Sequence, residues 1–430
     1  MPETIALQRP AALDAVVTPP GSKSLTNRAL TLAAIAEGRS RISGALAADD
    51  TVLMKGCLEA LGLDVVTDGD VIEIEGRGGG LRCDGIARLD VGLAGTVARF
   101  LTAVLAASPG RARIDGTERM RERPMDMLID ALRDQGAAIQ CLAAEGFLPV
   151  LVGPHYGSLK GGTIRLARPA SSQFVSALVL AGLLAERPTT IVLEQGTPAR
   201  PYIDMTLATV RAFGGDAQWR DDREITVAPG RLSAQDYAVE PDASGASYFL
   251  ALAAIHGGKV EVPGVGASSL QGDAKFAALL GQMGAEVEQR DSVTIVRGTG
   301  TLHGGDFDLA DTPDMTLTLA VAAAHATSPT TITGVDVLRH HESDRIAAIA
   351  TELRKLGVHV DERPDGLSIR PPSGSLARGV TVGSHGDHRM AMALSLVGDI
   401  VVEDPACVAK TYPRYFDELR NLGMVAAHGG

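Results

Sequence analysis

The chain has 430 residues, a formal net charge of −12 and 3% aromatic residues. This length is enough for two or more domains with sizeable cores. The acidity and the few aromatic rings argue against nucleic acid as a partner, because nucleic-acid binding needs a basic face and stacking side chains. An acidic protein that binds anions must gather its lysines and arginines locally, so their positions are the best guide to function.

Membrane insertion, secretion and disulfide bonding are not expected. No apolar run approaches the ~20 residues needed to cross a bilayer, and residues 1–4 lack the basic-then-apolar pattern of a secretory signal. The cysteines at 57, 83, 141 and 407 are far apart and form no CxxC pair, which predicts neither a disulfide framework nor a zinc site. We therefore expect a soluble cytoplasmic protein.

Residues 20–30 are the first stretch with a clear chemical character. Apolar residues spaced i, i+4, i+7 and i+8 from Leu25 predict an amphipathic helix. Lys23 and Ser24 then lie at its N-terminus, and Ser24 shares a face with Arg28. Unpaired N–H groups and the helix dipole favour an anion there, which predicts a phosphate or carboxylate site. A capped helix with solvated Lys and Arg fits the stretch as well.

An internal repeat runs through the whole chain. A helix end, a glycine and an alternating strand recur at glycines 62, 136, 214, 284, 357 and 423. Glycine fits there as the left-handed residue that ends a helix. A second, Ala- and Leu-rich helix also recurs once in each period, beginning near residues 24, 96, 172, 244, 315 and 389.

This period predicts an α/β fold of six repeated units. Each unit reads helix, strand, loop, helix, strand, strand. The recurring glycines are about 70 residues apart. Units of this length are too long for a solenoid, whereas two domains of three units each have ordinary sizes. The break is expected after the third unit, at residues 239–242.

Candidate anion-binding residues open the helices of the second and third units. Gly95 begins one helix, with Arg99 one turn further on. The following loop carries arginines that suit a two-point grip on carboxylate or phosphate, although a solvated charge cluster fits them too; they are Arg119, Arg121 and Arg123. The third unit opens with hydrogen-bonding side chains that suit a phosphate or polyol, with simple capping as the alternative; they are Ser171, Ser172 and Gln173, followed later by Tyr202.

The fifth and sixth units add carboxylates and further cations. Asp314 stands at a helix start, and Glu342 lies three residues before Arg345 on the next helix, so the latter two lie together. A purely structural salt bridge is the alternative. The sixth unit contributes Arg389 and Lys410. The pairs His340-His341 and His385/His388 raise a metal site as an alternative, but no third ligand is evident, and we expect no metal.

Taken together in chain order, these motifs resemble the EPSP synthases, the 3-phosphoshikimate 1-carboxyvinyltransferases of the shikimate pathway. The similarity covers essentially the whole chain. It implies two domains, residues 22–241 and residues 1–21 with 242–430, each made of three α/β units around a pseudo-threefold axis, with the active site in the cleft between them. The first residues are thereby assigned to the C-terminal domain.

The resemblance also implies the reaction and its residues. The family transfers the enolpyruvyl group of phosphoenolpyruvate to the 5-hydroxyl of shikimate 3-phosphate, with release of phosphate and without a cofactor. Proton transfer would fall to Asp314, Glu342 and Lys23. The residues that would hold phosphoenolpyruvate are Lys23, Gly95, Arg123, Gln173, Arg345, Arg389 and Lys410. Those that would hold shikimate 3-phosphate are Lys23, Ser24, Arg28, Ser171, Ser172, Gln173, Tyr202, Asp314 and His341.

Five positions depart from the commonest family pattern. They are Leu93 for Asn, Phe100 for Pro, Ala199 for a phosphate-binding Ser, Val337 for Asn, and His341 for Lys. Arg200 is a candidate to compensate for the missing Ser. If a protonated His341 donates to a shikimate hydroxyl, activity falls as it deprotonates.

Three other functions are weighed against this one. The sister enzyme that uses UDP-N-acetylglucosamine has Lys-Asn near its start and a loop cysteine, whereas this chain has Lys23-Ser24 and no cysteine at residues 119–123. An RNA-end-processing protein of related α/β units conflicts with the acidity. A non-catalytic homologue would bind the phosphorylated sugar acid without turnover. We expect a monomeric enzyme.

Overall fold

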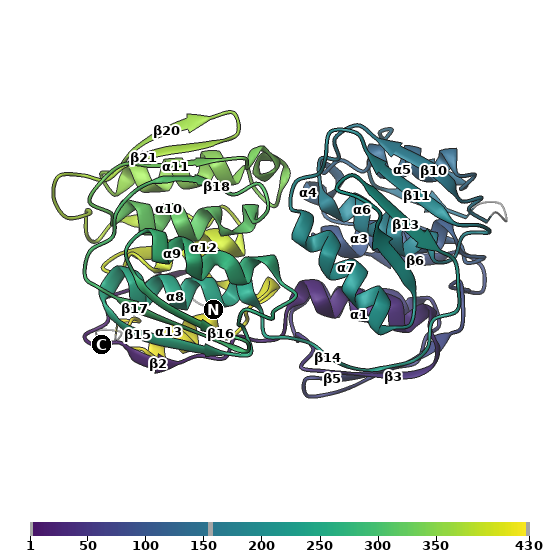
Figure 1. Ribbon diagram of the computed structural model, residues 1–430, viewed down its shortest axis with the longest axis horizontal. Coiled ribbons are helices and arrows are strands. Elements are labelled where there is room, and N and C mark those ends of the chain that lie inside the picture. Colours follow the sequence, from purple (N-terminus) through teal and green to yellow (C-terminus); the bar gives the residue numbers. More distant parts are fainter. Residues whose placement is uncertain (1–2, 154–157, 427–430) are drawn as a thin grey trace. The chain divides into compact units, whose positions relative to one another are not determined.

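The computed structural model describes residues 3–153 and 158–426. The chain divides into two compact units: unit 1 comprises Met1–Pro20 and Glu240–Gly430, and unit 2 comprises Gly21–Val239. Within the described residues the strands form six sheets, five of four strands and one of three. The predicted mixed α/β class is confirmed (Figure 1).

Unit 2 contains three sheets of one design. Their orders are β14-β3-β5-β4, β6-β7-β9-β8 and β10-β11-β13-β12, and in each the first pair is parallel and the other pairs are antiparallel. The strands are β3 (Glu37–Ser43), β4 (Val65–Asp68), β5 (Val71–Arg77), β6 (Ala87–Asp90), β7 (Ala112–Asp115), β8 (Ile139–Cys141), β9 (Val150–Val152), β10 (Gly162–Leu166), β11 (Thr189–Leu193), β12 (Asp216–Trp219), β13 (Glu224–Ala228) and β14 (Asp236–Ala238).

Unit 1 repeats that design with help from the N-terminus. Its sheets are β16-β17-β15-β2, β18-β19-β21-β20 and β1-β23-β22, so the strands of residues 3–16 complete two sheets whose other strands follow residue 257. The strands are β1 (Thr4–Ala6), β2 (Asp14–Val16), β15 (Gly258–Pro263), β16 (Glu286–Arg290), β17 (Val293–Gly298), β18 (Asp306–Asp308), β19 (Thr330–Thr333), β20 (His359–Arg363), β21 (Gly366–Arg370), β22 (Thr381–Val382) and β23 (Val401–Glu403).

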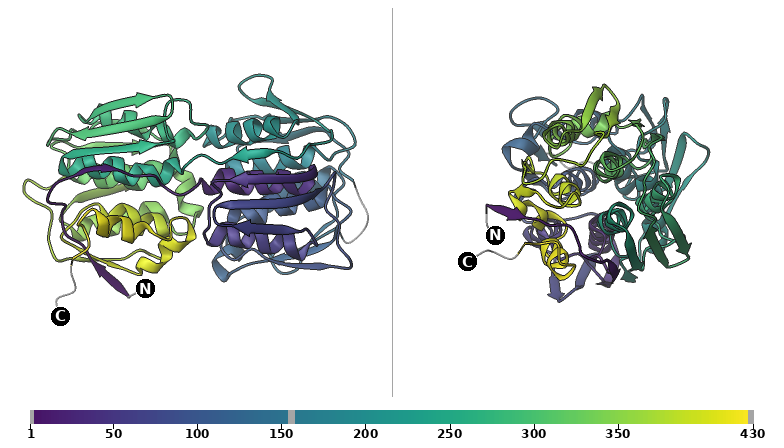
Figure 2. Two further views of the ribbon diagram at one scale, coloured as in Figure 1. Left: turned by 90° about the horizontal axis from the view of Figure 1, so that it is seen from below. Right: turned by 90° about the vertical axis from the view of Figure 1, so that its left-hand side faces the viewer.

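Buried central helices form the core of each unit. In unit 2 they are α1 (Lys23–Ile35), α3 (Gly95–Ala106) and α6 (Ser172–Gly182); in unit 1 they are α8 (Ala243–His256), α10 (Thr316–Ala324) and α12 (His388–Ser395). Each packs against its own sheet, and Figure 2 (right) looks nearly along the helices of unit 1, with strands around them. These are the six recurring helices predicted from the sequence, and side chains buried on all sides explain their Ala- and Leu-rich composition.

More amphipathic helices precede the recurring glycines 62, 136, 214, 284, 357 and 423, called the marker glycines below. They are α2 (Asp49–Ala60), α5 (Asp126–Asp134), α7 (Arg200–Ala212), α9 (Phe276–Gln282), α11 (Arg345–Lys355) and α13 (Tyr415–Asn421). All six glycines have positive φ, from 73° to 107°. At each, the next residue's N–H donates back to a carbonyl of the helix, as Leu63 does to Leu58, which is the Schellman motif. The prediction that glycine ends these helices is confirmed.

Short helical turns complete the inventory. They are α4 (Glu118–Arg121), η1 (Gly272–Lys275), η2 (Pro313–Met315), η3 (Asp336–His340) and η4 (Pro405–Lys410). In the described part of the chain, no helix is long and apolar enough to span a bilayer.

Candidate active site

Most of the predicted site residues lie at or near the N-terminal ends of the central helices. Lys23 and Ser24 open α1, Gly95 opens α3, Ser172 and Gln173 open α6, Asp314 lies just before α10, and Arg389 lies in the first turn of α12. The unpaired N–H groups of such ends favour anions. Five of the six repeats thus carry predicted site residues at the start of their central helix. The residues of each unit are described separately below.

In unit 1, Arg345 is the centre of the charged cluster. Its side chain is 2% exposed. Nε donates to Asp387 Oδ2 over 2.7 Å and Nη2 to Asp387 Oδ1 over 3.2 Å. Nη1 donates to Asp314 Oδ1 (2.9 Å), and Nη2 also donates to Glu342 Oε2 (3.0 Å). With the bond from Nη1 to His341 Nδ1 (3.0 Å), all five N–H donors of the guanidinium are used.

Both predicted proton-transfer carboxylates of unit 1 have a second cation. Glu342 Oε1 lies 3.0 Å from Lys410 Nζ, and Asp314 Oδ2 accepts a 2.8 Å hydrogen bond from Arg389 Nη2. The four charged side chains are at most 16% exposed. Two carboxylates and three cations therefore lie together in a poorly hydrated place, where their interactions are stronger than at the surface.

Opposing effects act on the Arg345 guanidinium. Burial alone would lower its pKa, but the charges of Asp387, Glu342 and Asp314 outweigh the burial and raise the pKa above its usual value. Arg345 stays charged at every pH of interest. The predicted contact between Glu342 and Arg345 is confirmed.

In unit 2, Lys23 lies beside a buried carboxylate. Its Nζ is 3.3 Å from Asp50 Oδ2, with side-chain exposures of 15% and 4%. Asp50 stands in the first turn of α2, and Ser22 caps α1 by accepting from the Leu25 N–H. Asp50 was not a predicted site residue, because nothing in its local sequence connects it to Lys23.

Two buried arginines stand over Gly95. A methyl group on the Gly95 Cα would lie 2.6 Å from Arg99 Nη1 and 2.8 and 2.9 Å from the two terminal nitrogens of Arg123. Arg99 donates to Gln173 Oε1 (2.6 Å) and Pro124 O (3.2 Å), and its guanidinium lies 5.0 Å from the Phe174 ring centre. Arg99 was noted one turn after Gly95 in the sequence, but it is missing from the residues that the resemblance assigns to either substrate.

Arg28 directs its guanidinium into the packing of unit 2. Nε donates to Thr206 Oγ1 (2.7 Å), Nη1 to Ser24 O (2.9 Å), and Nη2 to Tyr202 O (2.8 Å) and Ser176 Oγ (3.4 Å). The residue is 2% exposed, and burial lowers the pKa of Arg28 to about 10. Arg28 therefore joins α1 to α6 and α7, a structural task that its place in the sequence did not indicate.

The remaining polar residues of unit 2 cap helices or lie at the surface. Ser171 caps α6 by accepting from the Gln173 N–H, and Ser172 is buried. Arg119 pairs with Glu122, and Arg121 makes two hydrogen bonds to Asp115, all with exposed guanidinium groups. These ion pairs match the alternative of a solvated charge cluster for Arg119 and Arg121, and a joint grip of the three loop arginines on an anion stays a prediction.

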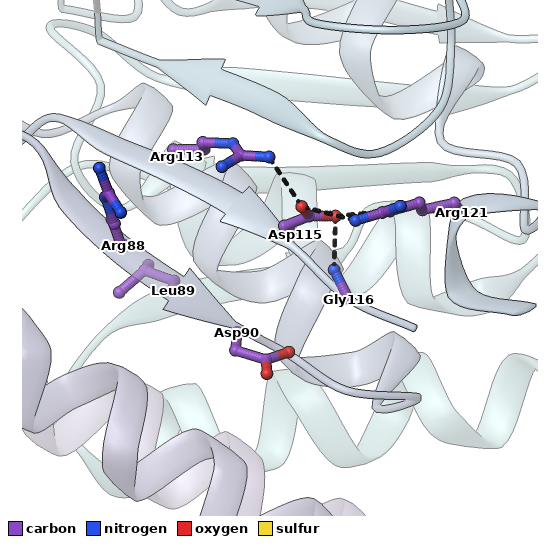
Figure 3. A pocket seen from close by; sticks show the side chains of 7 residues that line it. All are labelled: Arg88, Leu89, Asp90, Arg113, Asp115, Gly116 and Arg121. Carbon is purple, nitrogen blue, oxygen red and sulfur yellow. Dashed lines mark hydrogen bonds and ion pairs between the residues drawn. The ribbon is translucent and has the colours of Figure 1, made fainter. Parts of the chain in front are cut away.

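A surface pocket of about 270 Å³ lies near that loop (Figure 3). Asp115 sits between Arg113 and Arg121 and binds both, and these ion pairs lower the pKa of the Asp115 carboxyl against the effect of its partial burial. The pocket is lined by Arg88, Leu89, Asp90, Arg113, Asp115, Gly116 and Arg121. Of these, only Arg121 is among the candidate anion-binding residues predicted from the sequence.

The histidines have other partners. His385 Nε2 lies 2.8 Å from Glu352 Oε1, and the ring of His388 is 1% exposed beside Asp387. Among residues 3–153 and 158–426 no group of three or more His, Cys, Asp or Glu is arranged to hold a metal ion.

Four of the departing positions have the following surroundings. Leu93 contributes its backbone carbonyl to Arg123 (3.3 Å), and Phe100 lies 5.3 Å from the Arg28 guanidinium. Ala199 precedes α7 in a left-handed conformation, φ 53°, and Val337 is buried in η3. Arg200 stacks on Trp219 and pairs with Asp222.

Comparisons with known proteins identify the family. The family model described as EPSP synthase (3-phosphoshikimate 1-carboxyvinyltransferase) matches residues 7–419. A 3-phosphoshikimate 1-carboxyvinyltransferase of Photobacterium profundum is 41% identical over 432 residues, and one of Yersinia pestis is 42% identical over 434 residues; each alignment covers 99% of this chain and all of the relative.

Solved structures give the same result. An EPSP synthase from Acinetobacter baumannii matches with a TM-score of 0.82 and 28% identity over 98% of both chains. The resemblance drawn from the motifs is confirmed. Since the family model and full-length relatives above 40% identity agree, the chain belongs to the EPSP synthase (3-phosphoshikimate 1-carboxyvinyltransferase) family.

Proposed function

We propose that the chain transfers the enolpyruvyl group of phosphoenolpyruvate to the 5-hydroxyl of shikimate 3-phosphate and releases phosphate. The observation that carries this is the Arg345 guanidinium, which holds two carboxylates at once, Asp314 at 2.9 Å and Glu342 at 3.0 Å. A reaction that must take a proton from a hydroxyl and give one to a carbon needs two such groups at fixed positions.

The proton steps follow from the bonds that change. Asp314 accepts the proton of the 5-hydroxyl while the oxygen of that hydroxyl bonds to C2 of phosphoenolpyruvate. Glu342, protonated in the bound state, delivers a proton to the methylene carbon. In the second step the bond between C2 and phosphate breaks, and Glu342 acts as the base that takes a proton back from the neighbouring carbon. This restores the carbon–carbon double bond of the enolpyruvyl group. Lys23 supports proton transfer beside the leaving phosphate.

Cations hold the phosphate and carboxylate of phosphoenolpyruvate. We assign this to Arg345, Arg389 and Lys410 of unit 1, and to Lys23, Gly95, Arg123 and Gln173 of unit 2. We add Arg99, which shares Gly95 and Gln173 with them. All five N–H donors of Arg345 already have partners in this structure. Phosphoenolpyruvate can therefore bind Arg345 only by displacing His341 or a carboxylate oxygen. When a carboxylate oxygen is displaced, the bond that is lost and the bond that is gained are both charge-assisted hydrogen bonds from arginine to an anion.

Shikimate 3-phosphate takes hydrogen bonds from the polar helix ends. We assign it to Ser24, Ser171, Ser172, Gln173 and Tyr202, with Lys23 and Asp314 shared between the substrates. Arg28 acts mainly by positioning Ser24, whose carbonyl it holds, and His341 offers its Nε2–H. We take units 1 and 2 as the two predicted domains.

The proposal needs no metal or organic cofactor, because side chains supply the acid, the base and the positive charge. Both substrates are multiply charged and do not cross a bilayer unaided, so we place the enzyme in the cytoplasm with them. We further propose a monomer, without nucleic-acid or membrane partners.

Phosphate release from phosphoenolpyruvate tests the function. The assay compares shikimate 3-phosphate, UDP-N-acetylglucosamine and no acceptor, each with a chelator present. Release that depends on shikimate 3-phosphate and ignores the chelator is expected. A folded protein that binds shikimate 3-phosphate without turnover would instead be a non-catalytic homologue, and release with the nucleotide sugar would reassign the substrate.

A further inference from the structure

A second carboxylate lies behind the proton-transfer carboxylate Asp314. Asp273, in η1, is 4% exposed, and its Oδ2 accepts a short hydrogen bond from the Ser244 hydroxyl. Ser244, in the first turn of α8, is 6% exposed. Neither residue belongs to the predicted site, and they lie 41 and 70 residues from Asp314 in the chain.

The Ser244 hydroxyl links Asp273 to the site. Its oxygen also accepts from Arg389 Nη2 over 3.3 Å, and the same Nη2 donates to Asp314 Oδ2 over 2.8 Å. A hydroxyl has one hydrogen and two lone pairs. Because the hydrogen goes to Asp273, the lone pairs face Arg389, and the three bonds form one directed chain.

We infer that Asp273 is a positioning residue for the proposed reaction: through Ser244 it fixes Arg389 on Asp314 Oδ2, so that the carboxylate is held on both oxygens. Arg345 holds the other oxygen. A carboxylate held by two cations keeps the orientation that proton abstraction needs, and small errors of position are costly. This inference rests on the role proposed for Asp314.

The direction of the chain depends on the charge of Asp273. A neutral carboxylic acid would offer its own O–H to Ser244, and the serine hydrogen would then turn toward the Arg389 cation. Burial and the neighbouring Asp314 raise the pKa of Asp273 to about 6, while Arg389 and the Ser244 hydrogen bond oppose that rise and Asp242 adds to it.

Kinetics of Asp273→Asn, Ser244→Ala and the double variant test the inference. Each single variant should lose roughly 10-fold to 100-fold in kcat, with the Kd of shikimate 3-phosphate unchanged. The double variant should lose no more than the worse single one, because both break one chain. Wild type should also lose kcat as the pH falls through about 6, and both variants should lack that step.

Glu352→Gln is the matched control, since Glu352 is a 1% exposed carboxylate of unit 1 bound to Lys355 and His385. It should keep the kcat step near pH 6. Single-variant losses that multiply in the double variant, or Asp273→Asn with wild-type kcat and pH profile, would overturn the inference.

Inactivity of the wild type would refute the proposed function without deciding this question. The coupling between Asp273→Asn and Ser244→Ala in the free energy of unfolding then decides it. Additive destabilisation at pH 7.5 would overturn the chain of bonds, and non-additive destabilisation would support it.

Discussion

Arg345 and Asp387 form a two-point ion pair in the interior of unit 1. Nε to Oδ2 measures 2.7 Å and Nη2 to Oδ1 measures 3.2 Å, with side-chain exposures of 2% and 0%. Asp387 also caps α12 through the Arg389 N–H. One carboxylate therefore fixes the orientation of Arg345 and the start of the helix that carries Arg389.

Asp387→Asn should destabilise unit 1 by about 3–5 kcal/mol, because it leaves a buried guanidinium without its main counter-charge. Urea denaturation at pH 7.5 measures this. Asp361→Asn is the control, since its pair with Arg370 is about half exposed and is worth at most about 1 kcal/mol. Equal losses in the two variants would contradict the central place given to Asp387.

Gly95→Ala should weaken phosphoenolpyruvate far more than shikimate 3-phosphate. The added methyl would lie within 2.9 Å of three guanidinium nitrogens, and Arg99 is held by Gln173 and Phe174, so the arginines must shift. We expect KM for phosphoenolpyruvate to rise about 10-fold or more, roughly 1.4 kcal/mol.

Gly56→Ala is the matched control for Gly95→Ala. Gly56 lies inside α2, and a methyl there meets nothing within 4 Å. Its KM values should stay unchanged while stability rises by about 0.5–1 kcal/mol. A Gly95→Ala variant with normal KM would remove Arg99 and Arg123 from the phosphoenolpyruvate site.

Arg28→Ala and Ser24→Ala should separate packing from binding. Loss of Arg28 removes the donor to the Thr206 hydroxyl, while the Thr206 hydroxyl can still donate to Ser176 or to the Tyr202 carbonyl. Unit 2 should therefore lose about 1–3 kcal/mol in thermal or urea unfolding, the cost of one buried group left unsatisfied. Ser24→Ala should keep the unfolding midpoint and raise the Kd of shikimate 3-phosphate, measured by calorimetry. A fully stable Arg28→Ala variant would show that the interior bonds contribute little.

The architecture could be predicted because its signals are local. Each marker glycine follows its helix directly and needs positive φ for the cap, and each central helix has an apolar composition that only complete burial explains. The pairing of β1 and β2 with strands beyond residue 257 has no such local signal, and only the resemblance pointed to it.

The direction of a charged side chain could not be predicted. A spacing of four places Ser24 and Arg28 on one face, but the acceptors that draw Arg28 inward lie 148 to 178 residues away. The same holds for Arg121, which turns to Asp115 while Arg123 turns inward. Asp273 and Ser244 were missed for this reason: each looks like an ordinary residue of a turn or cap until Arg389 is placed beside them.

His341 should be neutral at Nδ1, with its hydrogen on Nε2. Arginine can only donate, so the 3.0 Å bond from Arg345 requires Nδ1 as acceptor. This geometry reverses the sign expected from the sequence: protonation, rather than deprotonation, breaks a bond in the site. Nitrogen-15 NMR of the imidazoles at pH 7.5, assigned with His341→Asn, should show this tautomer, and a ring protonated on both nitrogens would restore the original expectation.

Asp273 should make stability fall as the pH rises. Its pKa in the folded protein is about 6, above the ~3.9 of an unfolded aspartate. Below pH ~4 both states bind the proton. Between that pH and about 6 only the folded state does, so a rise in pH favours the ionised unfolded chain and lowers the free energy of unfolding. Asn carries no charge at any pH. The stability of Asp273→Asn relative to wild type should therefore rise across this window, by an amount on the order of 3 kcal/mol.

Glu352→Gln should show the opposite sign. Burial acts to raise the pKa of Glu352, but hydrogen bonds from Lys355, the Gly383 N–H and His385 lower it overall. That carboxylate adds stability above its unfolded pKa, and the addition is lost as the pH falls through its folded value. Urea unfolding of wild type and both variants at pH 4.5 and 7.5 measures the two slopes together. Slopes of the same sign would mean that the Asp273 carboxyl ionises more easily in the folded protein than in the unfolded chain, and that Ser244 and Arg389 more than compensate its burial.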